Sequence, residues 1–465
     1  MKLKFFSLLI ALATFCTSWA GTPKYIFYFI GDGMGMGHIM STETYNRTVL
    51  GNTDPILMMQ FPVASLAMTY SYSSPVTDSA AAGTALSTGH KTRNYMLGMG
   101  PDTIPVYSIA KSFKENGYGV AITTTVAPDD ATPGSFYTHV PNRSMYYEIG
   151  MDMARSGYDF FAGSHLRGLK DKEGKETDLL PTLTKNGYQV AYGVDEIDKA
   201  SKKVVLLAPK KSFNGYQCGY TIDSVPGALT LPQITKAALD HLTKVSPDKF
   251  FMMVEGGNID WAAHANDGGA VVKEILNFNQ AIKIAYDFYL AHPDETLIVI
   301  TADHDTGGMT IGVSKGPKIV NFKNIDFQRI SKDVFAERCA AQLKSKRIYR
   351  WEDAKEELTS LFGLYKEVAV SEAQDKRLQE AFDLEYVKRA SRENKTLYAT
   401  FTGFAETVFD VLQHISGFGW TTNSHTGNPV PVFAVGAGSE KFSKISNNIE
   451  IPHRIADAAD VEFDK

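Results

Sequence analysis

The sequence has few cysteines, no basic block, and no long apolar run beyond its first twenty residues. Three cysteines in 465 residues, without Cys-x-x-Cys or metal-ligand spacing, exclude a disulfide scaffold. Cys218 and Cys339 lie beyond residue 20, and the sequence leaves open whether they form one disulfide or two buried thiols. No later run approaches the roughly 18 apolar residues of a membrane span. A net charge of −5 without clustered basic residues argues against a nucleic-acid groove but leaves anionic small molecules open as substrates.

The N-terminus has the layout of a secretory signal. Lys2 and Lys4 form a positive start, residues 5–16 are mostly apolar, and Ser-Trp-Ala at 18–20 fits a small-x-small cleavage site. A buried first helix is the alternative, but core helices seldom show this order. We therefore expect residues 1–20 to be a signal peptide and the protein to be exported, to a periplasm or to the outside of the cell.

Hydrophobic residues make up 44% of the chain, which is enough for a large core, and several apolar runs read as buried strands. Three of these runs lead into or end on an acidic residue, namely Asp32, Glu255 or Asp303. Continuous apolar strands alternating with helices predict an α/β fold with a mainly parallel sheet covered on both faces. Ligands bind beyond the carboxyl ends of such strands, so the three acids predict one shared polar site. The runs lie at 25–30, 119–123, 250–254, 297–301 and 432–435.

Residues 315–400 differ in their pattern of apolar and charged residues from the rest of the chain. Apolar residues keep helical spacing among charges between 351 and 362 and again between 378 and 390. We interpret this stretch as a helical insertion packed on the main sheet. The expected organisation is therefore one domain, residues 21–465, with an inserted helical segment at about 315–400.

The first motif that could carry out chemistry is the glycine-rich turn at 31–37. No frame of it fits a dinucleotide fingerprint, which leaves Asp32 as either a turn residue or a functional acid. The second motif is Asp78-Ser79 before an alanine-rich helix. One of these residues is a simple helix cap, or Ser79 is a nucleophile at a helix N-terminus that attracts an anion.

Three further clusters offer metal ligands. Asp260 and His264 are four residues apart, which puts both on one helix face near Glu255. Residues 303–304 pair an aspartate with a histidine at a strand end, and His425 lies in a polar loop. Oxygen and nitrogen donors without thiolates suit zinc, and an all-oxygen subset suits magnesium.

Six segments occur in a fixed order between about residues 24–312 and 400–440, and in combination they resemble the alkaline phosphatase family. They are Gly-Asp-Gly-Met-Gly, Val-Thr-Asp-Ser-Ala-Ala, Asp-Ala-Thr-Pro, Val-Glu-Gly-Gly-Asn-Ile-Asp, Thr-Ala-Asp-His-Asp-Thr-Gly-Gly and Gly-Trp-Thr-Thr-Asn-Ser-His-Thr-Gly. The resemblance implies a three-layer α/β sandwich, hydrolysis of small phosphate monoesters with release of inorganic phosphate, two Zn²⁺, one Mg²⁺ and a homodimer.

The resemblance also implies roles by matching position. Ser79 would be the nucleophile that becomes phosphoserine, Arg143 the phosphate clamp, and Asp78 the residue that orients Arg143. The second zinc would activate Ser79, and the first would stabilise the leaving oxygen and supply the hydrolytic water. The implied ligands are Asp260, His264 and His425 for the first zinc, Asp32, Asp303 and His304 for the second, and Asp32, Thr132 and Glu255 for magnesium.

Asp130 and Trp261 occupy positions around magnesium that vary among members of this family. Trp261 cannot donate a cationic hydrogen bond to phosphate, so we expect weaker phosphate binding than in a relative with lysine there. A phosphodiesterase and a non-catalytic phosphate- or metal-binding protein are the rival interpretations. A sulfatase would need a Pro and an Arg at fixed positions after its nucleophile, and Ala-Ala-Ala-Gly follows Ser79 instead.

Overall fold

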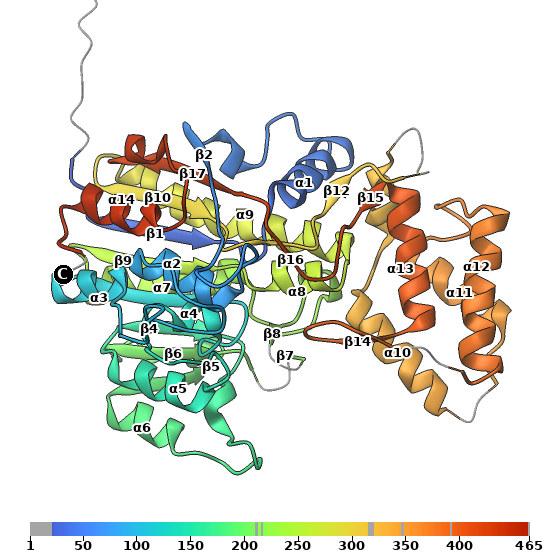
Figure 1. Cartoon of the computed structure of the whole chain (residues 1–465), viewed down its shortest axis with the longest axis horizontal. Coiled ribbons are helices and arrows are strands. Elements are labelled where there is room, and N and C mark those ends of the chain that lie inside the picture. The colour runs from blue at the N-terminus through green and yellow to red at the C-terminus, as the bar shows by residue number, and fades with distance from the viewer. Residues whose placement is uncertain are drawn as a thin grey trace, which may run out of the picture.

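The computed structural model describes residues 21–209, 213–214, 217–314, 320–345, 348–390 and 393–463 (Figure 1). The expected signal peptide, residues 1–20, lies outside the described residues. The described chain forms an α/β fold built on one large sheet, with a group of helices at one end of it.

The large sheet has nine strands in the order β2-β17-β10-β1-β9-β3-β4-β6-β5. β17 runs antiparallel to both of its neighbours, and the other pairs are parallel. The predicted mainly parallel sheet is therefore confirmed. The strands are β1 (Tyr25–Ile30), β2 (Val63–Ala67), β3 (Gly119–Thr124), β4 (Phe160–Gly163), β5 (Tyr188–Tyr192), β6 (Lys203–Leu207), β9 (Phe250–Glu255), β10 (Thr296–Thr301) and β17 (Val430–Gly436).

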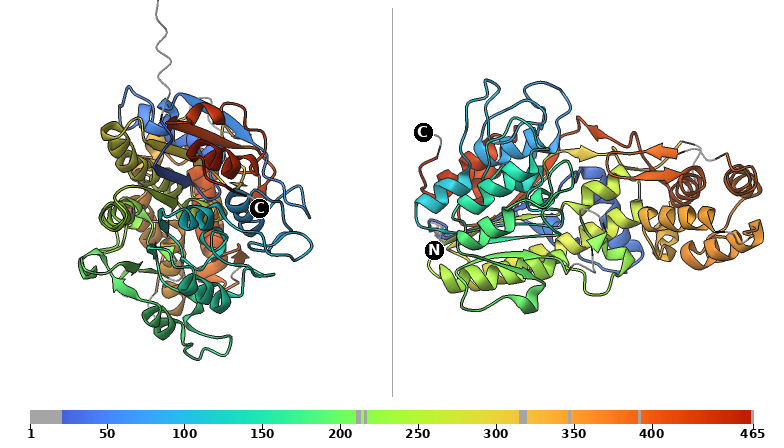
Figure 2. Two further views of the ribbon diagram at one scale, coloured as in Figure 1. Left: turned by 90° about the vertical axis from the view of Figure 1, so that its left-hand side faces the viewer. Right: turned by 90° about the horizontal axis from the view of Figure 1, so that it is seen from below.

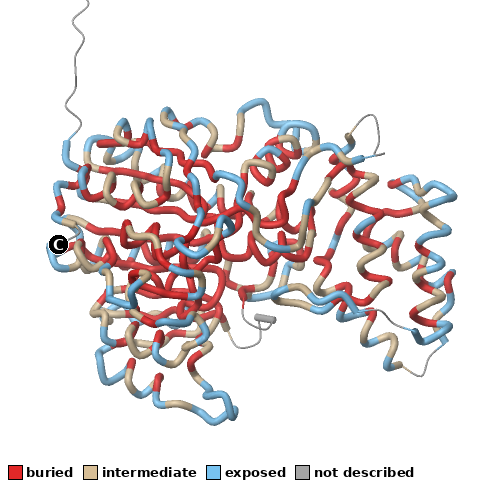
Figure 3. The backbone as a smooth tube through the Cα atoms, viewed as in Figure 1, coloured by how far each residue is buried: buried red, intermediate tan, exposed pale blue. Residues whose placement is uncertain are grey.

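Helices cover both faces of this sheet, as Figure 2 shows. Every residue of β3, β9 and β10 is buried, which explains their uninterrupted apolar sequence (Figure 3). One layer contains α1 (Met36–Thr48), α7 (Leu231–Val245) and α9 (Gly268–Ala291). The opposite layer contains α2 (Ser79–Thr88), α3 (Ile109–Glu115), α4 (Ala131–Gly134) and α14 (Glu450–Ala459).

The described chain has further elements outside the large sheet and the helices given above. The remaining helices of the main body are α5 (Tyr146–Arg155), α6 (Leu179–Lys185) and α8 (Asn258–His264). The short strands are β7 (Phe213–Asn214), β8 (Gln217–Cys218), β11 (Asp305–Thr306), β12 (Thr310–Ile311), β13 (Glu393–Lys395), β14 (Thr400–Thr402), β15 (Phe418–Gly419) and β16 (His425–Thr426).

The 3-10 helix Phe322–Phe327 contributes Phe322 and Ile325 to the core of the sheet, but the three longer helices within residues 315–400 do not pack on the main sheet, contrary to our expectation. α10 (Lys332–Lys344), α11 (Trp351–Phe362) and α12 (Glu372–Phe382) instead surround α13 (Gly403–Ser416), at the right of Figure 1. Their apolar faces bury one another in a second core, which is separate from the core of the sheet. The apolar faces of α10, α11, α12 and α13 are thus buried against one another rather than against the sheet.

The two cysteines beyond residue 20 are free thiols rather than a disulfide. Cys218 belongs to the core of the sheet and Cys339 to the core of the insertion. Burial raises the pKa of each thiol to about 12, so both behave as small apolar side chains. None of the described helices combines the length and the apolar character that spanning a bilayer requires.

Candidate active site

The acids predicted to share a site come from three neighbouring strands, β10, β1 and β9. Ile30 at the end of β1 is in register with Thr301 of β10 and with Glu255 of β9. Because these strands are parallel, their carboxyl ends meet at one edge of the sheet. Asp303, Asp32 and Glu255 therefore lie together, and all three are buried.

The turn after β1 requires glycine next to Asp32. Gly33 has a φ of 70°, and its N–H donates to Asp303 Oδ1 at 3.0 Å. A Cβ atom on Gly33 would lie 2.8 Å from Asp260 Oδ1. The glycine thus allows the backbone to pass between two carboxylates that a larger residue would push apart.

One predicted ligand set, Asp32, Asp303 and His304, forms a compact group in the structure. His304 Nε2 lies 3.4 Å from Asp32 Oδ1 and 3.2 Å from Asp303 Oδ2. All three side chains are buried, and Asp32 Oδ1 has no hydrogen-bond donor. This donor set suits zinc.

The other predicted set, Asp260, His264 and His425, also comes together. α8 carries Asp260 and His264, while pairing of β16 with β11 places His425 opposite Thr306. His264 Nε2 lies 3.4 Å from Asp260 Oδ1, and His425 Nε2 lies 3.7 Å from the same oxygen. The tighter group is Asp260, His425 and His304, whose ring stacks on that of His425 at 3.6 Å. His304 therefore touches both groups.

The proposed magnesium ligands Glu255 and Thr132 lie at the same edge of the sheet. The Thr132 hydroxyl donates to Asp303 Oδ2 at 3.4 Å. Neither carboxylate oxygen of Glu255 has a hydrogen-bond partner, and burial raises the pKa of Glu255 to about 8. Burial and the nearby Asp303 likewise hold the pKa of Asp32 well above its usual value.

Buried acceptor oxygens without donors are costly unless a cation neutralises them. Glu255, Asp32 and Asp260 all carry such oxygens here. The residues present therefore fit a group of bound divalent cations.

Ser79 is the first residue of α2 and is buried beside this cluster. Its Oγ lies 3.0 Å from His304 Nε2. Asp78 caps the helix, because its Oδ1 accepts from the N–H of Ala81 at 3.0 Å. Asp78 is thus a helix cap, and its cap fixes Ser79 at a helix N-terminus that faces the candidate metal ligands.

Arg143 is held between two carboxylates, as the expected role of Asp78 requires. Arg143 Nη1 donates to Asp78 Oδ2 at 3.4 Å, and Nη2 donates to Asp130 Oδ1 at 3.2 Å. A second arginine, Arg167, donates to the other Asp130 oxygen at 2.7 Å and stacks over Tyr146 at 4.0 Å. Burial alone would raise the pKa of Asp130, but Arg167 and then Arg143 outweigh it and lower that pKa.

Neither Arg167 nor Asp129, which fixes the turn that carries it, was identified from the sequence. Arg167 follows β4, which neighbours β3, so it reaches the same edge of the sheet as Asp130. Asp129 accepts from the N–H groups of Arg167 and Gly168 at 3.0 and 2.8 Å, which fixes this turn. The available signal was a basic residue shortly after a short apolar run, Phe160–Gly163.

Trp261 lies under the tip of the β13–β14 hairpin. Its ring stacks on Tyr398 with centroids 4.0 Å apart and planes 5° apart. Tyr398 also meets His264 edge-on at 5.2 Å. Tyr398 and Leu397 line a pocket of about 580 Å³ together with Arg143, Arg167, His264 and His425.

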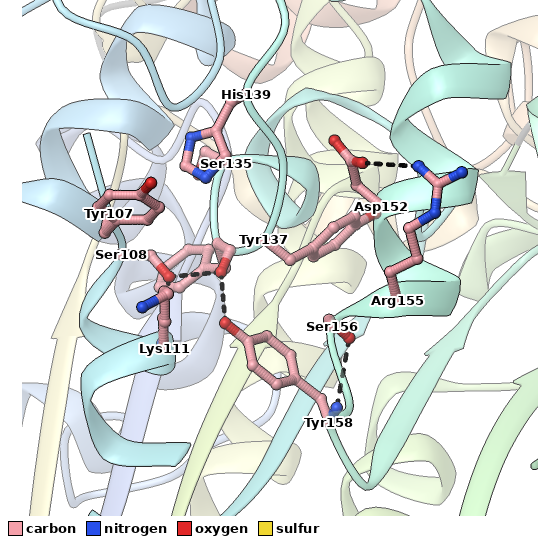
Figure 4. Close-up of a pocket in the computed structure, with 11 residues that line it drawn as sticks. Tyr107, Ser108, Lys111, Ser135, Tyr137, His139, Asp152, Arg155, Ser156 and Tyr158 are labelled. Carbon is pink, nitrogen blue, oxygen red and sulfur yellow. Dashed lines mark hydrogen bonds and ion pairs between the residues drawn. The ribbon is translucent and has the colours of Figure 1, made fainter. Parts of the chain in front are cut away.

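A second pocket, shown in Figure 4, has a different character. It measures about 240 Å³, and its lining includes Tyr107, Lys111, His139, Asp152 and Arg155. Asp152 pairs with Arg155 at 3.7 Å and accepts from Thr138 at 2.6 Å. Asp152 and Arg155 thus pair within this pocket, and neither candidate metal group lies there.

Comparisons with known proteins agree with the site. The family model for alkaline phosphatase matches residues 23–159 and 159–461. Alkaline phosphatase 3 of Bacillus subtilis is 31% identical over 454 residues, covering 93% of this chain and 88% of the relative. Alkaline phosphatase 4 of the same organism is 29% identical over 439 residues, covering 91% of this chain and 86% of the relative.

Solved structures give the same result. A cold-active alkaline phosphatase from Shewanella sp. superposes with a TM-score of 0.77 at 26% identity, covering 93% of this chain and 99% of that one. A variant of TAB5 alkaline phosphatase, with Mg bound in its M3 site, superposes with a TM-score of 0.66 at 25% identity, covering 95% and 99%. The fold, the site and these matches together show that the chain is an enzyme that belongs to the alkaline phosphatase family.

Proposed function

We propose that this protein hydrolyses phosphate monoesters through a phosphoserine intermediate on Ser79 and releases inorganic phosphate. The observation that carries the proposal is the position of Ser79 Oγ, 3.0 Å from the histidine shared by both candidate metal groups. Arg143, held by Asp78, lines the adjacent pocket and supplies a planar fork for two phosphoryl oxygens.

Two zinc ions and one magnesium ion complete the proposal. Bound metals would lower the pKa of the serine hydroxyl, stabilise the departing oxygen and activate water. The buried oxygens that lack donors support this occupancy. The proposed ligands are Asp260, His264 and His425 for one zinc, Asp32, Asp303 and His304 for the other, and Asp32, Thr132 and Glu255 for magnesium.

The chain's own residues account for binding and orientation. The oxygen of Ser79 attacks phosphorus, so a Ser79 O–P bond forms while the ester P–O bond breaks and the alcohol departs. Water then cleaves the Ser79 O–P bond, which releases phosphate and restores the hydroxyl. Arg143 holds two phosphoryl oxygens through both steps, and the N-terminus of α2 favours their negative charge.

A monoester fits these residues better than a diester. A monoester offers more charged oxygens than a diester does. Arg143, which lines the pocket, and the cations at the proposed sites would bind these charged oxygens. A protein that only binds phosphate or metal would not need a serine beside the ligands.

We also propose that the protein is exported and forms a homodimer. The layout of residues 1–20 supports export, and N-terminal sequencing of the mature protein is expected to begin at Gly21. The resemblance to the family supports the homodimer, and light scattering of the purified protein tests it.

The experiment for the main proposal is hydrolysis of an aryl phosphate monoester beside the matching diester at alkaline pH, with and without a chelator. We expect monoester cleavage that the chelator abolishes and zinc plus magnesium restore, with a weak diester rate. A reversed preference would assign a phosphodiesterase. No turnover of either ester after metals are restored would favour a binding protein.

A further inference from the structure

The pocket beside Arg143 is far larger than a phosphoryl group needs. At about 580 Å³, it falls in the range of sites that enclose a whole organic molecule. Arg143, His264 and His425 lie on its wall, so the extra space is continuous with the proposed phosphate position. That space is where the leaving group of an ester would lie.

Three large apolar side chains on this pocket's wall are unusually exposed. Val76 is 36% exposed, Tyr95 59% and Leu397 61%. We refer to these three residues as the apolar rim. Exposed apolar side chains that gather around one pocket mark a binding surface rather than random surface composition.

The backbone of Tyr95 is held in a conformation that aromatic residues rarely adopt. Its φ is 73°, and its N–H donates to Asp78 Oδ2 at 3.1 Å. Its carbonyl accepts from the N–H of Arg143 at 2.8 Å. Arg143, which would hold the phosphate, and Asp78, which orients Arg143, thus also fix the backbone of Tyr95. The left-handed conformation carries a cost that an asparagine or glycine would reduce.

Leu397 reaches the pocket from the other side, on the hairpin between β13 and β14. The neighbouring Tyr398 stacks flat on Trp261, on the helix that also carries Asp260 and His264. The hairpin is therefore docked on the site. The insertion that stands away from the sheet thus contributes a wall of the pocket.

We propose that the apolar rim is a leaving-group subsite that selects phosphate monoesters with a planar aromatic leaving group. This inference rests on the proposed function, because the phosphoryl group must lie at Arg143 for the leaving group to reach the rim. An aromatic ring would cover Tyr95 and Leu397 and remove their apolar surface from water. A short alkyl group would be too small to do so.

Two phosphonates test this without hydrolysis, because their C–P bond replaces the ester bond. We expect phenylphosphonate to inhibit monoester hydrolysis with an inhibition constant about tenfold lower than that of methylphosphonate. Tyr95→Asn removes the aromatic ring and introduces a residue that tolerates positive φ. Leu397→Ser removes the apolar side chain on the hairpin side of the pocket. Each is expected to reduce the phenyl-to-methyl ratio at least about threefold, while methylphosphonate inhibition stays constant.

Leu290→Ser is the matched control, since Leu290 is 59% exposed but does not line this pocket. It is expected to leave the ratio unchanged. Equal inhibition by the two phosphonates, while the enzyme hydrolyses monoesters normally, would overturn the subsite alone. Loss of dimer in Tyr95→Asn and Leu397→Ser with an unchanged ratio would overturn it too, and would assign the rim to a second copy of the chain. Absence of monoester hydrolysis in the unsubstituted enzyme would overturn the proposed function and this inference with it.

Discussion

The pocket of Figure 4 and the carboxylate cluster at the end of the sheet differ in how their charges are satisfied. In the pocket of Figure 4, Arg155 pairs with Asp152, and Lys111 pairs with Glu115 on its own helix. At the carboxyl ends of β10, β1 and β9, by contrast, Glu255 and Asp32 keep oxygens without donors. A buried acceptor without a donor costs free energy, so a fold retains it where something else supplies the charge. The comparison separates a pocket whose charges pair within the protein from a cluster of buried carboxylates that a bound cation would neutralise.

The largest expected effect comes from Ser79→Ala. Removing the nucleophile should lower kcat at least about 1,000-fold with metals saturating, because the other groups cannot form the covalent intermediate. Ser87→Ala is the matched control on the same helix, because the Ser87 hydroxyl donates to backbone carbonyls, of Ser135 at 2.9 Å and of Thr84 at 3.3 Å. It should keep most of the activity. Substantial turnover by Ser79→Ala would show that the nucleophile is another group.

Glu255→Gln should separate the cation site from ordinary buried acids. We expect its metal-dependent activity to fall about 10- to 100-fold, because a ligand charge is lost. In chelator-treated protein above pH 8, where a Glu255 carboxyl with a pKa of about 8 is ionised, the melting temperature should rise by about a few degrees, since an uncompensated buried charge is removed.

Glu274→Gln is the control for that comparison. Glu274 is also buried, but its Oε1 accepts from the N–H of Thr221 at 2.6 Å. Its substitution should lower the melting temperature whether or not metal is present, because a satisfied hydrogen bond is weakened. Equal behaviour of the two variants would contradict the distinction between a buried acid whose oxygens lack donors and one that is already hydrogen-bonded.

Arg167→Gln should weaken phosphate binding by about five- to tenfold, measured as the inhibition constant of inorganic phosphate. Without Arg167, Asp130 would draw Arg143 toward itself and away from the phosphoryl oxygens. Arg167→Lys should restore part of the affinity, as should Asp130→Asn added to Arg167→Gln. Arg155→Gln in the Figure 4 pocket should leave phosphate inhibition unchanged. A loss of the same size in Arg155→Gln would mean that both pockets act through general surface charge.

The smallest effect is expected from Trp261→Lys. A cation at this position should tighten phosphate inhibition by about threefold, although the stack with Tyr398 is lost. Steady-state inhibition of the variant beside the unsubstituted enzyme measures this. An unchanged inhibition constant would show that residue 261 does not influence phosphate.

Much of the site could be predicted from the sequence because its acids end buried strands. Buried strands have continuous apolar sequences, so the ends of β1, β9 and β10 could be located in the sequence. Asp32, Glu255 and Asp303 lie at or just after those ends. Arg167 could not be predicted as a site residue, because its position depends on β4 lying beside β3. Local sequence patterns do not determine the order of strands in a sheet.

The insertion shows the same limit. Helical spacing predicted helices in 351–362 and 378–390. The structure has α11 in the first range, whereas in the second α12 begins earlier, at Glu372, and a π-helix at Asp383–Val387 ends the helical structure. The sequence did not reveal that their partner is α13 rather than the sheet, because an amphipathic stripe specifies burial but not which surface buries it.

The most direct test of the two-step account is the stereochemistry of phosphoryl transfer from a monoester that is chiral at phosphorus. Attack by Ser79 and then by water inverts phosphorus twice. The account therefore predicts overall retention of configuration in the thiophosphate released when a phosphorothioate monoester that carries two oxygen isotopes is hydrolysed in water of the third isotope. Overall inversion would show direct attack by water and would contradict the phosphoserine intermediate.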